Sequence, residues 1–264
     1  MMVQSGTLPH SLASRCGGCV CCNLRGLCLP ECLAMADVES LQRIVSHGRP
    51  LPPGGILYRI GDAFESIYVV RSGSFKTLHV TEQGAEQVTG FYLPGEIVGF
   101  DGIDEGTHQS TAIALETTGV CRIPFQRLEA LCRMLPALQH RLLRTMSGEI
   151  CANHHVHQVL AQCSADERLA LMLLNLSRRV SRRQGISPLR FRLPMPRADL
   201  SNYLGLVPET LSRLFRRFCE NGWISSDGRE LALKDIAALR AVADGNIQLA
   251  RDGTDPDHLA AYNY

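Results

Sequence analysis

The sequence predicts an α+β protein in which a β domain, one long helix and a helix-turn-helix domain follow one another. Three observations support this prediction. Short runs rich in Val, Ile, Tyr and Phe, separated by glycine, fill residues 49–124, a spacing typical of all-β sandwiches and barrels. An apolar stripe at helical spacing runs through residues 136–160. Two short amphipathic segments joined by a glycine turn lie within residues 197–217.

The first element is a cysteine-rich segment, residues 1–33. Six of the eleven cysteines lie there, at positions 16, 19, 21, 22, 28 and 32. Crowded reduced thiols favour redox or metal chemistry. Cys19, Cys22 and Cys28 share a turn-rich stretch of the kind that holds iron–sulfur clusters, which usually take four cysteines. A fourth ligand would have to come from elsewhere in the fold. Zinc also accepts four thiolates, so a zinc or thiol redox sensor is an open alternative.

Composition and charge limit the class of protein. A hydrophobic fraction of 45% and a charged fraction of 20% are ordinary for a globular chain. We expect a cytoplasmic protein, because residues 1–14 lack a signal-peptide pattern and no run of about 18 apolar residues exists. The net charge of +1 conceals eleven arginines against four acidic residues between Asp166 and Arg217. This excess predicts a polyanion partner. Common nucleotide-binding and hydrolase motifs are absent from the sequence, so we expect no enzyme.

The β domain and the long helix come next. A short helix is expected near residues 37–46, then strands with turns at 82–85 and 93–96, and we place this domain at residues 34–135. The helix of residues 136–163 has an apolar seam that favours a homodimer interface over packing on its own domain. The seam residues are Leu142, Met146, Ile150, Asn153, His157 and Leu160. Asn153 and His157 interrupt the seam, so we expect a dimer of tunable strength.

The helix-turn-helix domain spans residues 164–240. One short helix begins at Arg197, Gly205 supplies a left-handed turn, and Pro208 begins a second helix. The expected core face of the second helix is Leu211, Leu214, Phe215 and Phe218, and its expected outer face is Glu209, Ser212, Arg213, Arg216 and Arg217. Such a helix enters the major groove, where arginine can pair with guanine and a carboxylate can accept from cytosine. An Asp-Gly turn at 227–228 predicts a β-hairpin wing. Residues 241–264 are expected to be a loosely ordered tail.

Several separate motifs between residues 19 and 239 occur together in a known family. They include Cys19-x2-Cys22-x5-Cys28-Leu-Pro, Tyr68-Val-Val-Arg-Ser-Gly-Ser74, Leu115-Glu-Thr-Thr-Gly-Val-Cys121-Arg-Ile-Pro-Phe125 and Asn202-Tyr-Leu-Gly205. On these motifs the chain resembles the FNR/ANR regulators of the CRP/FNR superfamily. The resemblance implies a β-roll similar to a cyclic-nucleotide-binding jelly roll, a dimerisation helix and a winged helix-turn-helix.

The resemblance also implies a function and its residues. An oxygen-labile 4Fe–4S cluster would bind Cys19, Cys22, Cys28 and Cys121. The base-reading residues would be Glu209, Ser212 and Arg213, at a palindrome similar to TTGAT-N4-ATCAA. A homodimer with the cluster would then bind DNA, contact RNA polymerase and control anaerobic gene expression as an oxygen-responsive transcription activator.

Departures from the family pattern leave alternatives. A shifted ligand set that includes Cys16 or Cys21 stays open. Asn153 stands where the family commonly has aspartate, so we expect easier dimerisation without the cluster. The runner-up function is a CRP-like regulator controlled by another small ligand. Binding of a cyclic nucleotide is disfavoured, because residues 107–111 contain no arginine to pair with its phosphate.

Overall fold

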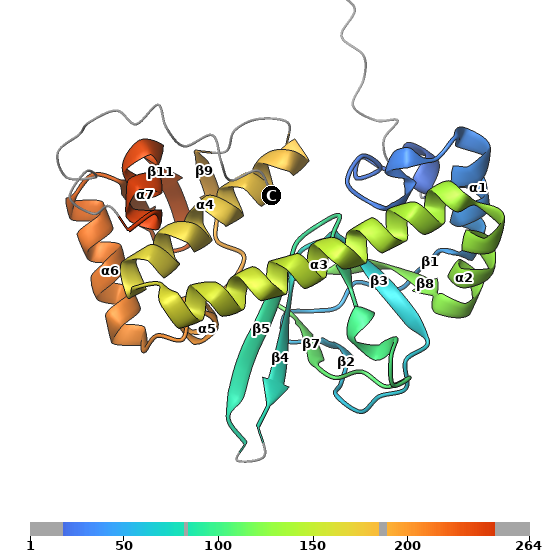
Figure 1. Cartoon of the computed structure of the whole chain (residues 1–264), viewed down its shortest axis with the longest axis horizontal. Coiled ribbons are helices and arrows are strands. Elements are labelled where there is room, and N and C mark those ends of the chain that lie inside the picture. The colour runs from blue at the N-terminus through green and yellow to red at the C-terminus, as the bar shows by residue number, and fades with distance from the viewer. Residues whose placement is uncertain (1–17, 82–83, 185–188, 246–264) are drawn as a thin grey trace, which may run out of the picture.

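The structure, a computed structural model, describes residues 18–81, 84–184 and 189–245. An N-terminal β-roll, a long helix and a C-terminal winged helix-turn-helix follow one another, and the long helix α3 passes across the β-roll to the C-terminal domain (Figure 1). The predicted fold class is therefore confirmed. Among the described residues, no helix combines the length and the apolar character needed to cross a bilayer.

The β-roll consists of two antiparallel sheets with strand orders β1-β8-β3-β6 and β2-β7-β4-β5. Its strands are β1 Ser46–His47, β2 Ile56–Tyr58, β3 Ser66–Ser72, β4 Phe75–Val80, β5 Glu86–Tyr92, β6 Ile97–Val98, β7 Thr111–Ala114 and β8 Gly119–Pro124. Alternate residues of β3 face opposite sides of the sheet, as strand geometry requires. Val70 packs inside the roll with Phe75, whereas Ile67 and Val69 pack with the helices outside it.

Helices cover the outer face of the first sheet. These elements are η1 Cys19–Cys21, η2 Leu29–Cys32, α1 Met35–Ile44, α2 Phe125–Met134 and the first part of α3 Pro136–Gln162, while η3 Phe100–Gly102 follows β6. Val38 and Leu41 of α1 and Leu128 of α2 are buried in the same core as Ile67 and Val69. This layer fixes the N-terminal segment and the long helix against one surface of the sheet.

A capping box separates α3 from α4 Ala165–Gln184. The Ser164 N–H donates to Glu167 Oε2 at 2.6 Å, and the Glu167 N–H donates to Ser164 Oγ at 3.4 Å. Reciprocal bonds of this kind satisfy the first N–H groups of a helix, so they define where α4 begins. The same Ser-x-x-Glu pattern is the sequence signal that locates α4, an element absent from the sequence-based expectation.

The C-terminal domain has its own core, which includes Leu169, Leu173 and Leu239. After α4 come β9 Arg190–Arg192, α5 Arg197–Tyr203, α6 Pro208–Glu220, β10 Ile224–Asp227, β11 Glu230–Leu233 and α7 Ile236–Ala243. The expected tail boundary at residue 241 is wrong by three residues, because Ala241 and Val242 are buried in α7. The rest of the expected tail, from residue 246, lies outside the described residues.

Gly73 provides a test of the β-roll geometry. It joins β3 to β4 at φ +74, and a Cβ there would lie 2.4 Å from Thr118 Oγ1 and 2.7 Å from the Thr117 carbonyl oxygen. Gly73→Ala should therefore lower the thermal midpoint well beyond the effect of the left-handed backbone alone, which costs about 1–2 kcal/mol. Gly61→Ala is the matched control, since Gly61 has φ +84 with open space around it. Equal midpoints for the two variants would contradict the tight packing at Gly73.

Candidate DNA-reading helix and cysteine pocket

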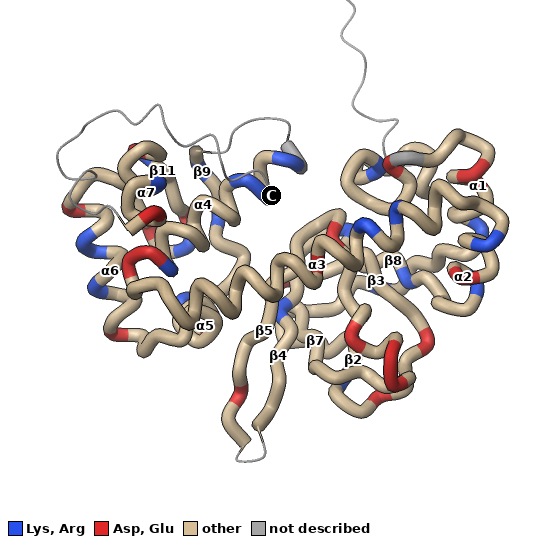
Figure 2. The backbone as a smooth tube through the Cα atoms, in the orientation of Figure 1, with Lys and Arg blue, Asp and Glu red and all other residues tan. Residues whose placement is uncertain are grey.

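The second helix of the helix-turn-helix, α6, has the predicted division into faces. Leu211, Leu214, Phe215 and Phe218 are buried, whereas Glu209, Ser212, Arg213, Arg216 and Arg217 are exposed. Pro208 begins α6, and Gly205 in the preceding turn has φ +63, which a residue with a side chain rarely adopts. Basic residues lie along α6 (Figure 2). The exposed arc therefore combines a carboxylate, a hydroxyl and guanidinium groups, which can pair with base edges and phosphates.

Arg197 fixes this helix to its neighbours. Its guanidinium carbon lies 3.1 Å from the ring centroid of Phe215 in α6, and its Nη2 donates to Ser226 Oγ in the wing at 2.7 Å. Burial lowers the pKa of Arg197 to about 10, so the side chain stays charged at neutral pH. A cation over an aromatic face is attracted by the ring quadrupole. Arg197 thus joins α5, α6 and the wing.

Not all of the arginines counted as a polyanion footprint face outward. Besides Arg197, Arg168 donates to three main-chain carbonyls, at Leu160, Cys163 and Leu204. Arg179 pairs with Glu96 of the β-roll at 2.6 Å. These three arginines are structural, so the sequence count overstates the charge available to DNA. Arg178 and Arg182 of α4 are exposed, as the footprint requires.

The predicted seam on α3 divides between two environments. Leu142 is buried in the core of its own β-roll, and Met146 packs partly against that core. Leu160 is half-buried, while Asn153 and His157 are exposed. The side chain of Ile150 is 55% exposed. Leu143, which the predicted seam omits, is 57% exposed.

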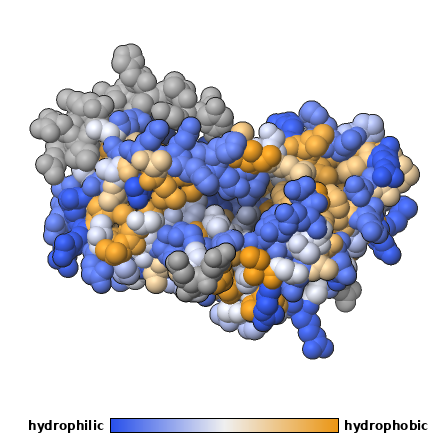
Figure 3. Space-filling view, turned by 60° about the horizontal axis from the view of Figure 1, so that its bottom comes forward, coloured by the Kyte–Doolittle hydropathy of each residue, from blue (hydrophilic) through white to orange (hydrophobic). Residues whose placement is uncertain are grey.

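The outward arc of α3 is therefore rotated slightly from the predicted one. Leu142 serves the intramolecular core, because its face of the helix lies on the sheet. Apolar patches interrupt the hydrophilic surface on the face shown in Figure 3, and exposed apolar side chains on a long helix are candidates for contact with another chain.

Side chains pack the interior of the β-roll near residues 108–111, which contain no arginine that could pair with the phosphate of a cyclic nucleotide. His108 is 2% exposed, and its ring stacks on Tyr58 with centroids 3.6 Å apart. His108 Nδ1 lies 3.1 Å from Asp101 Oδ1, and Ser110 Oγ donates to Asp101 Oδ2 at 2.7 Å. Asp101 is thus satisfied by its own neighbours. This packing agrees with the argument against a bound cyclic nucleotide.

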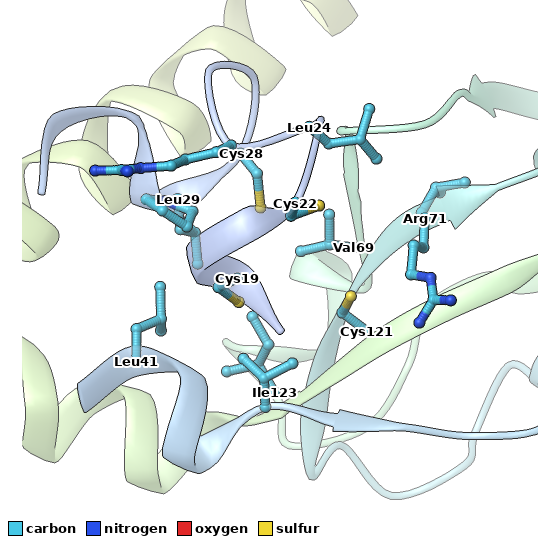
Figure 4. A pocket seen from close by; sticks show the side chains of 14 residues that line it. Cys19, Cys22, Leu24, Cys28, Leu29, Leu41, Val69, Arg71, Cys121 and Ile123 are labelled. Carbon is cyan, nitrogen blue, oxygen red and sulfur yellow. The ribbon is translucent and has the colours of Figure 1, made fainter. Parts of the chain in front are cut away.

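Four cysteines face one pocket on the opposite, outer side of the sheet (Figure 4). Cys19, Cys22 and Cys28 come from the N-terminal segment, and Cys121 comes from β8. Most of the remaining lining is apolar and includes Leu24, Leu29, Leu41, Val45, Val69 and Ile123. The structure therefore brings together all four residues of the expected ligand set.

Strand register explains the direction of Cys121. It pairs with Val69 of β3 on one side and His47 of β1 on the other, and Ile67 pairs with Ile123. Because side chains alternate along a strand, Cys121 lies on the same outer face as Ile123, while Val120 packs inside the roll. A register shift of one residue would turn the thiol into the interior.

The N-terminal segment is held to α1 and α3 by polar contacts. The Val20 N–H donates to Gln42 Oε1 of α1 at 3.2 Å. Arg141 of α3 pairs with Glu31 at 2.5 Å and donates to the Leu27 carbonyl at 3.5 Å. These contacts position the cysteine loop over β8.

Burial raises the pKa of three thiols at the pocket, those of Cys19, Cys28 and Cys121. Desolvation, with smaller contributions from Cys121, Cys19 and Cys22, raises the pKa of Cys28 to about 12, although a hydrogen bond with the Leu29 backbone opposes the rise. Desolvation also raises the pKa of Cys121 to about 11, although Arg71 opposes the rise. Ionised thiols here repel one another in an apolar site. A bound cationic group would relieve that repulsion, since metals bind thiolates.

The spacing of the pocket thiols bears on which metal group they could hold. In the described part of the chain, no three His, Cys, Asp or Glu side chains converge closely enough to hold a single metal ion. A zinc site needs its sulfur ligands about 2.3 Å from one point. An iron–sulfur cluster instead takes its thiolates on different iron atoms, so they can lie further apart.

The other cysteines have different surroundings. Cys132 is buried, Cys163 and Cys219 are half-buried, and Cys151 is exposed. Cys21 is exposed and disulfide-bonded, so it is not one of the four free thiols that line the pocket. The alternative ligand Cys16 lies outside the described residues.

The raised pKa of Cys28 predicts slow alkylation in reduced, metal-free protein. Thiolate is the nucleophile, so a pKa of about 12 in place of 9.0 lowers the reactive fraction at pH 8 about a thousandfold. With iodoacetamide at pH 8, Cys151 should react first and Cys28 last, as peptide mass spectrometry over time would show. Equal rates for the two residues would mean that the loop does not dock on the sheet without metal.

Comparison with known proteins agrees with this architecture. Residues 48–134 match the cyclic nucleotide-binding domain model, and residues 167–242 match the Crp-like helix-turn-helix domain model. The FixK2 structure from Bradyrhizobium japonicum has a TM-score of 0.68 and 25% identity, and covers 75% of this chain and 97% of that one.

Two relatives are similar over nearly their whole length. The transcriptional activator protein FnrA of Stutzerimonas stutzeri is 48% identical over 88% of this chain and 95% of its own length. The transcriptional activator protein Anr of Pseudomonas aeruginosa is 48% identical over 87% of this chain and 94% of its own. The observed fold and the helix-turn-helix that contains α6 agree with similarity to transcriptional activators. The chain therefore belongs to the FNR/ANR family of DNA-binding transcription regulators in the CRP/FNR superfamily, whose members are not enzymes.

Proposed function

We propose that this regulator senses oxygen through a 4Fe–4S cluster bound by Cys19, Cys22, Cys28 and Cys121, and controls anaerobic gene expression. One observation carries the proposal: four free thiols from separate parts of the chain line one apolar pocket. Thiolates are the usual ligands of such clusters. The cluster, when bound, supplies the oxygen-reactive group.

The chain's own residues would transmit cluster binding to α3. The loop between Cys22 and Cys28 is tied to α3 through Arg141, which contacts both Leu27 and Glu31. Ordering this loop over Cys121 would favour one packing of α3 on the sheet. A ligand that binds one arrangement better than another shifts the population toward it. Loss of the cluster would free the loop and reverse the shift.

We infer that α3 pairs with a second copy of the chain to form a homodimer. Leu143 and Ile150 are large exposed apolar residues on α3, and Asn153 and His157 are exposed further along the helix. A dimer about this helix would present two α6 helices to DNA. Half-sites one helical turn apart, about 34–36 Å, then match the two copies. Similarity to transcriptional activators also supports the proposal of a cytoplasmic location and of contact with RNA polymerase.

We assign base reading to Glu209, Ser212 and Arg213. All three are exposed on the first half of α6, with the helix held from behind by Arg197. Arginine pairs with guanine through two hydrogen bonds, and a carboxylate accepts from cytosine. This set suits a TTGAT-N4-ATCAA-like palindrome.

DNA binding with and without air tests the proposal. Anaerobically purified protein should be brown, contain iron and acid-labile sulfide, and bind the palindrome, and air should abolish all three properties. Cys121→Ser should lose iron and sulfide because the site then lacks one of its four thiolates. Cys132→Ser is the control, since Cys132 is buried in packing away from the pocket. Full iron content in Cys121→Ser would exclude this ligand, and colourless protein with zinc would favour the zinc alternative.

Arg213→Ala tests base reading separately. Loss of a bidentate pair with guanine should cost about 1–3 kcal/mol per half-site and relax the preference at that base. Arg178→Ala is the comparison, because Arg178 is exposed on α4, outside the proposed reading helix, where we expect any DNA contact to be with phosphate. It should weaken all sequences alike and reduce the salt slope by about one. Titrations on the palindrome and on a guanine-substituted version would distinguish the two effects, and equal losses for Arg213→Ala on both would contradict base reading.

A further inference from the structure

The β5 strand is the exposed edge of its sheet, and the side chain of Asn202 in α5 covers that edge. The Val88 N–H donates to Asn202 Oδ1 at 2.7 Å, and Asn202 Nδ2 donates to the Glu86 carbonyl at 2.8 Å. Gln87 Nε2 also donates to the Asn202 carbonyl at 3.0 Å. A side-chain amide has one acceptor and a donor, so it pairs with the edge as a neighbouring strand would.

An ion pair lies beside this contact. Lys76 Nζ of β4 is 2.7 Å from Asp199 Oδ1 of α5, and the two side chains are only 14% and 17% exposed. Exposed pairs contribute little, but a pair that is mostly withdrawn from water leaves a costly unpaired charge when one partner is removed. The pair therefore resists separation of α5 from the β-hairpin.

Apolar packing joins the same surfaces. Val88, Phe91 and Leu93 of the β-roll belong to the core that the helix-turn-helix builds. The rings of Phe91 and Tyr203 lie 5.1 Å apart. On α4, Arg179 pairs with Glu96. The β-hairpin and the helix-turn-helix thus share one interface, which we name the α5 clamp, consisting of Lys76, Val88, Phe91, Asp199 and Asn202.

The α5 clamp holds the helix-turn-helix without covering its reading face. All its contacts to the motif come from α5, whereas Glu209, Ser212 and Arg213 of α6 are exposed. Two recognition helices must face DNA at a fixed separation for both half-sites to be read. A domain that swung freely on the end of α3 would lose entropy on binding, and a docked domain avoids that cost.

We propose that Lys76, Asp199 and Asn202 are positioning residues for DNA recognition, which hold the helix-turn-helix on the β-hairpin in the orientation that binds DNA. This proposed role depends on DNA binding, which the family shares, and does not depend on the proposed 4Fe–4S cluster. Disrupting the clamp should therefore weaken DNA binding while iron and sulfide content and dimer mass stay those of the unchanged protein. That combination separates failure of the clamp from failure of the proposed oxygen sensing.

Asp199→Asn gives the sharpest test, because two explanations predict opposite signs. Removing a negative charge near DNA should tighten binding by general electrostatics, whereas loss of the clamp should weaken it about threefold to tenfold. Glu220→Gln removes the same charge from an exposed residue at the end of α6, so it is the matched control. Asn202→Ala changes no charge and should weaken binding to a similar extent. Affinities would be measured anaerobically on the palindrome by fluorescence anisotropy.

Unchanged or tighter binding by both Asp199→Asn and Asn202→Ala would overturn the proposal. Tighter binding by Asn202→Ala would mean that the α5 clamp holds the helix-turn-helix in an orientation that does not bind DNA. Hydrogen exchange of the Val88 amide in the unchanged protein is a second measurement that needs no variant. Protection of that amide supports the clamp, since its partner is the Asn202 side chain. Free exchange would show that β5 and α5 are separated in solution.

Discussion

The gathering of four half-buried thiols between a loop and a sheet is the constraint on which the proposed oxygen sensing depends. Cys121 is fixed because its strand is paired on both sides, at His47 and at Val69. The loop with Cys19, Cys22 and Cys28 has only short 3₁₀ turns and a few polar anchors. Desolvation raises the pKa of Cys19, Cys28 and Cys121, so binding of a metal group at these thiols would release protons. In the proposed mechanism, the loop is the part that responds to the bound group.

In the proposed mechanism, helix α3 is the element through which that response reaches the C-terminal domain. At its start, Leu138 packs on the sheet, and Arg141 contacts the cysteine loop. Near its middle, the Tyr92 hydroxyl donates to Glu149 at 2.8 Å, and burial raises the pKa of that carboxyl. At its end, Arg168 bonds the Leu160 and Cys163 carbonyls and also the Leu204 carbonyl beside the helix-turn-helix. Each part of α3 therefore contacts a different functional unit of the same chain.

Local patterns in the sequence predicted what local physics decides. The turn at Gly205, the start at Pro208 and the two faces of α6 follow from helix geometry, and all agree with the structure. Long-range partners do not follow in this way. Arg179 looks like any surface arginine on a helix until Glu96 is found beside it. The predicted α3 seam includes Leu142 rather than Leu143 because periodicity identifies an apolar arc without revealing which part of it lies on the sheet. Cys121 could be linked to the loop only by family resemblance, since nothing local relates positions about a hundred residues apart.

The two faces of the first sheet separate the interior of the β-roll from the cysteine pocket. Inside the roll, Tyr58, His108 and Asp101 pack and bond with one another. Strand alternation places Val70 toward that interior and Val69 with Cys121 toward the outside. A ligand on the outer face would contact α1 and the loop directly, and α3 through Arg141, without opening the interior. In the proposed mechanism, the signal would pass to α3 over the surface of the roll, while side chains pack the interior.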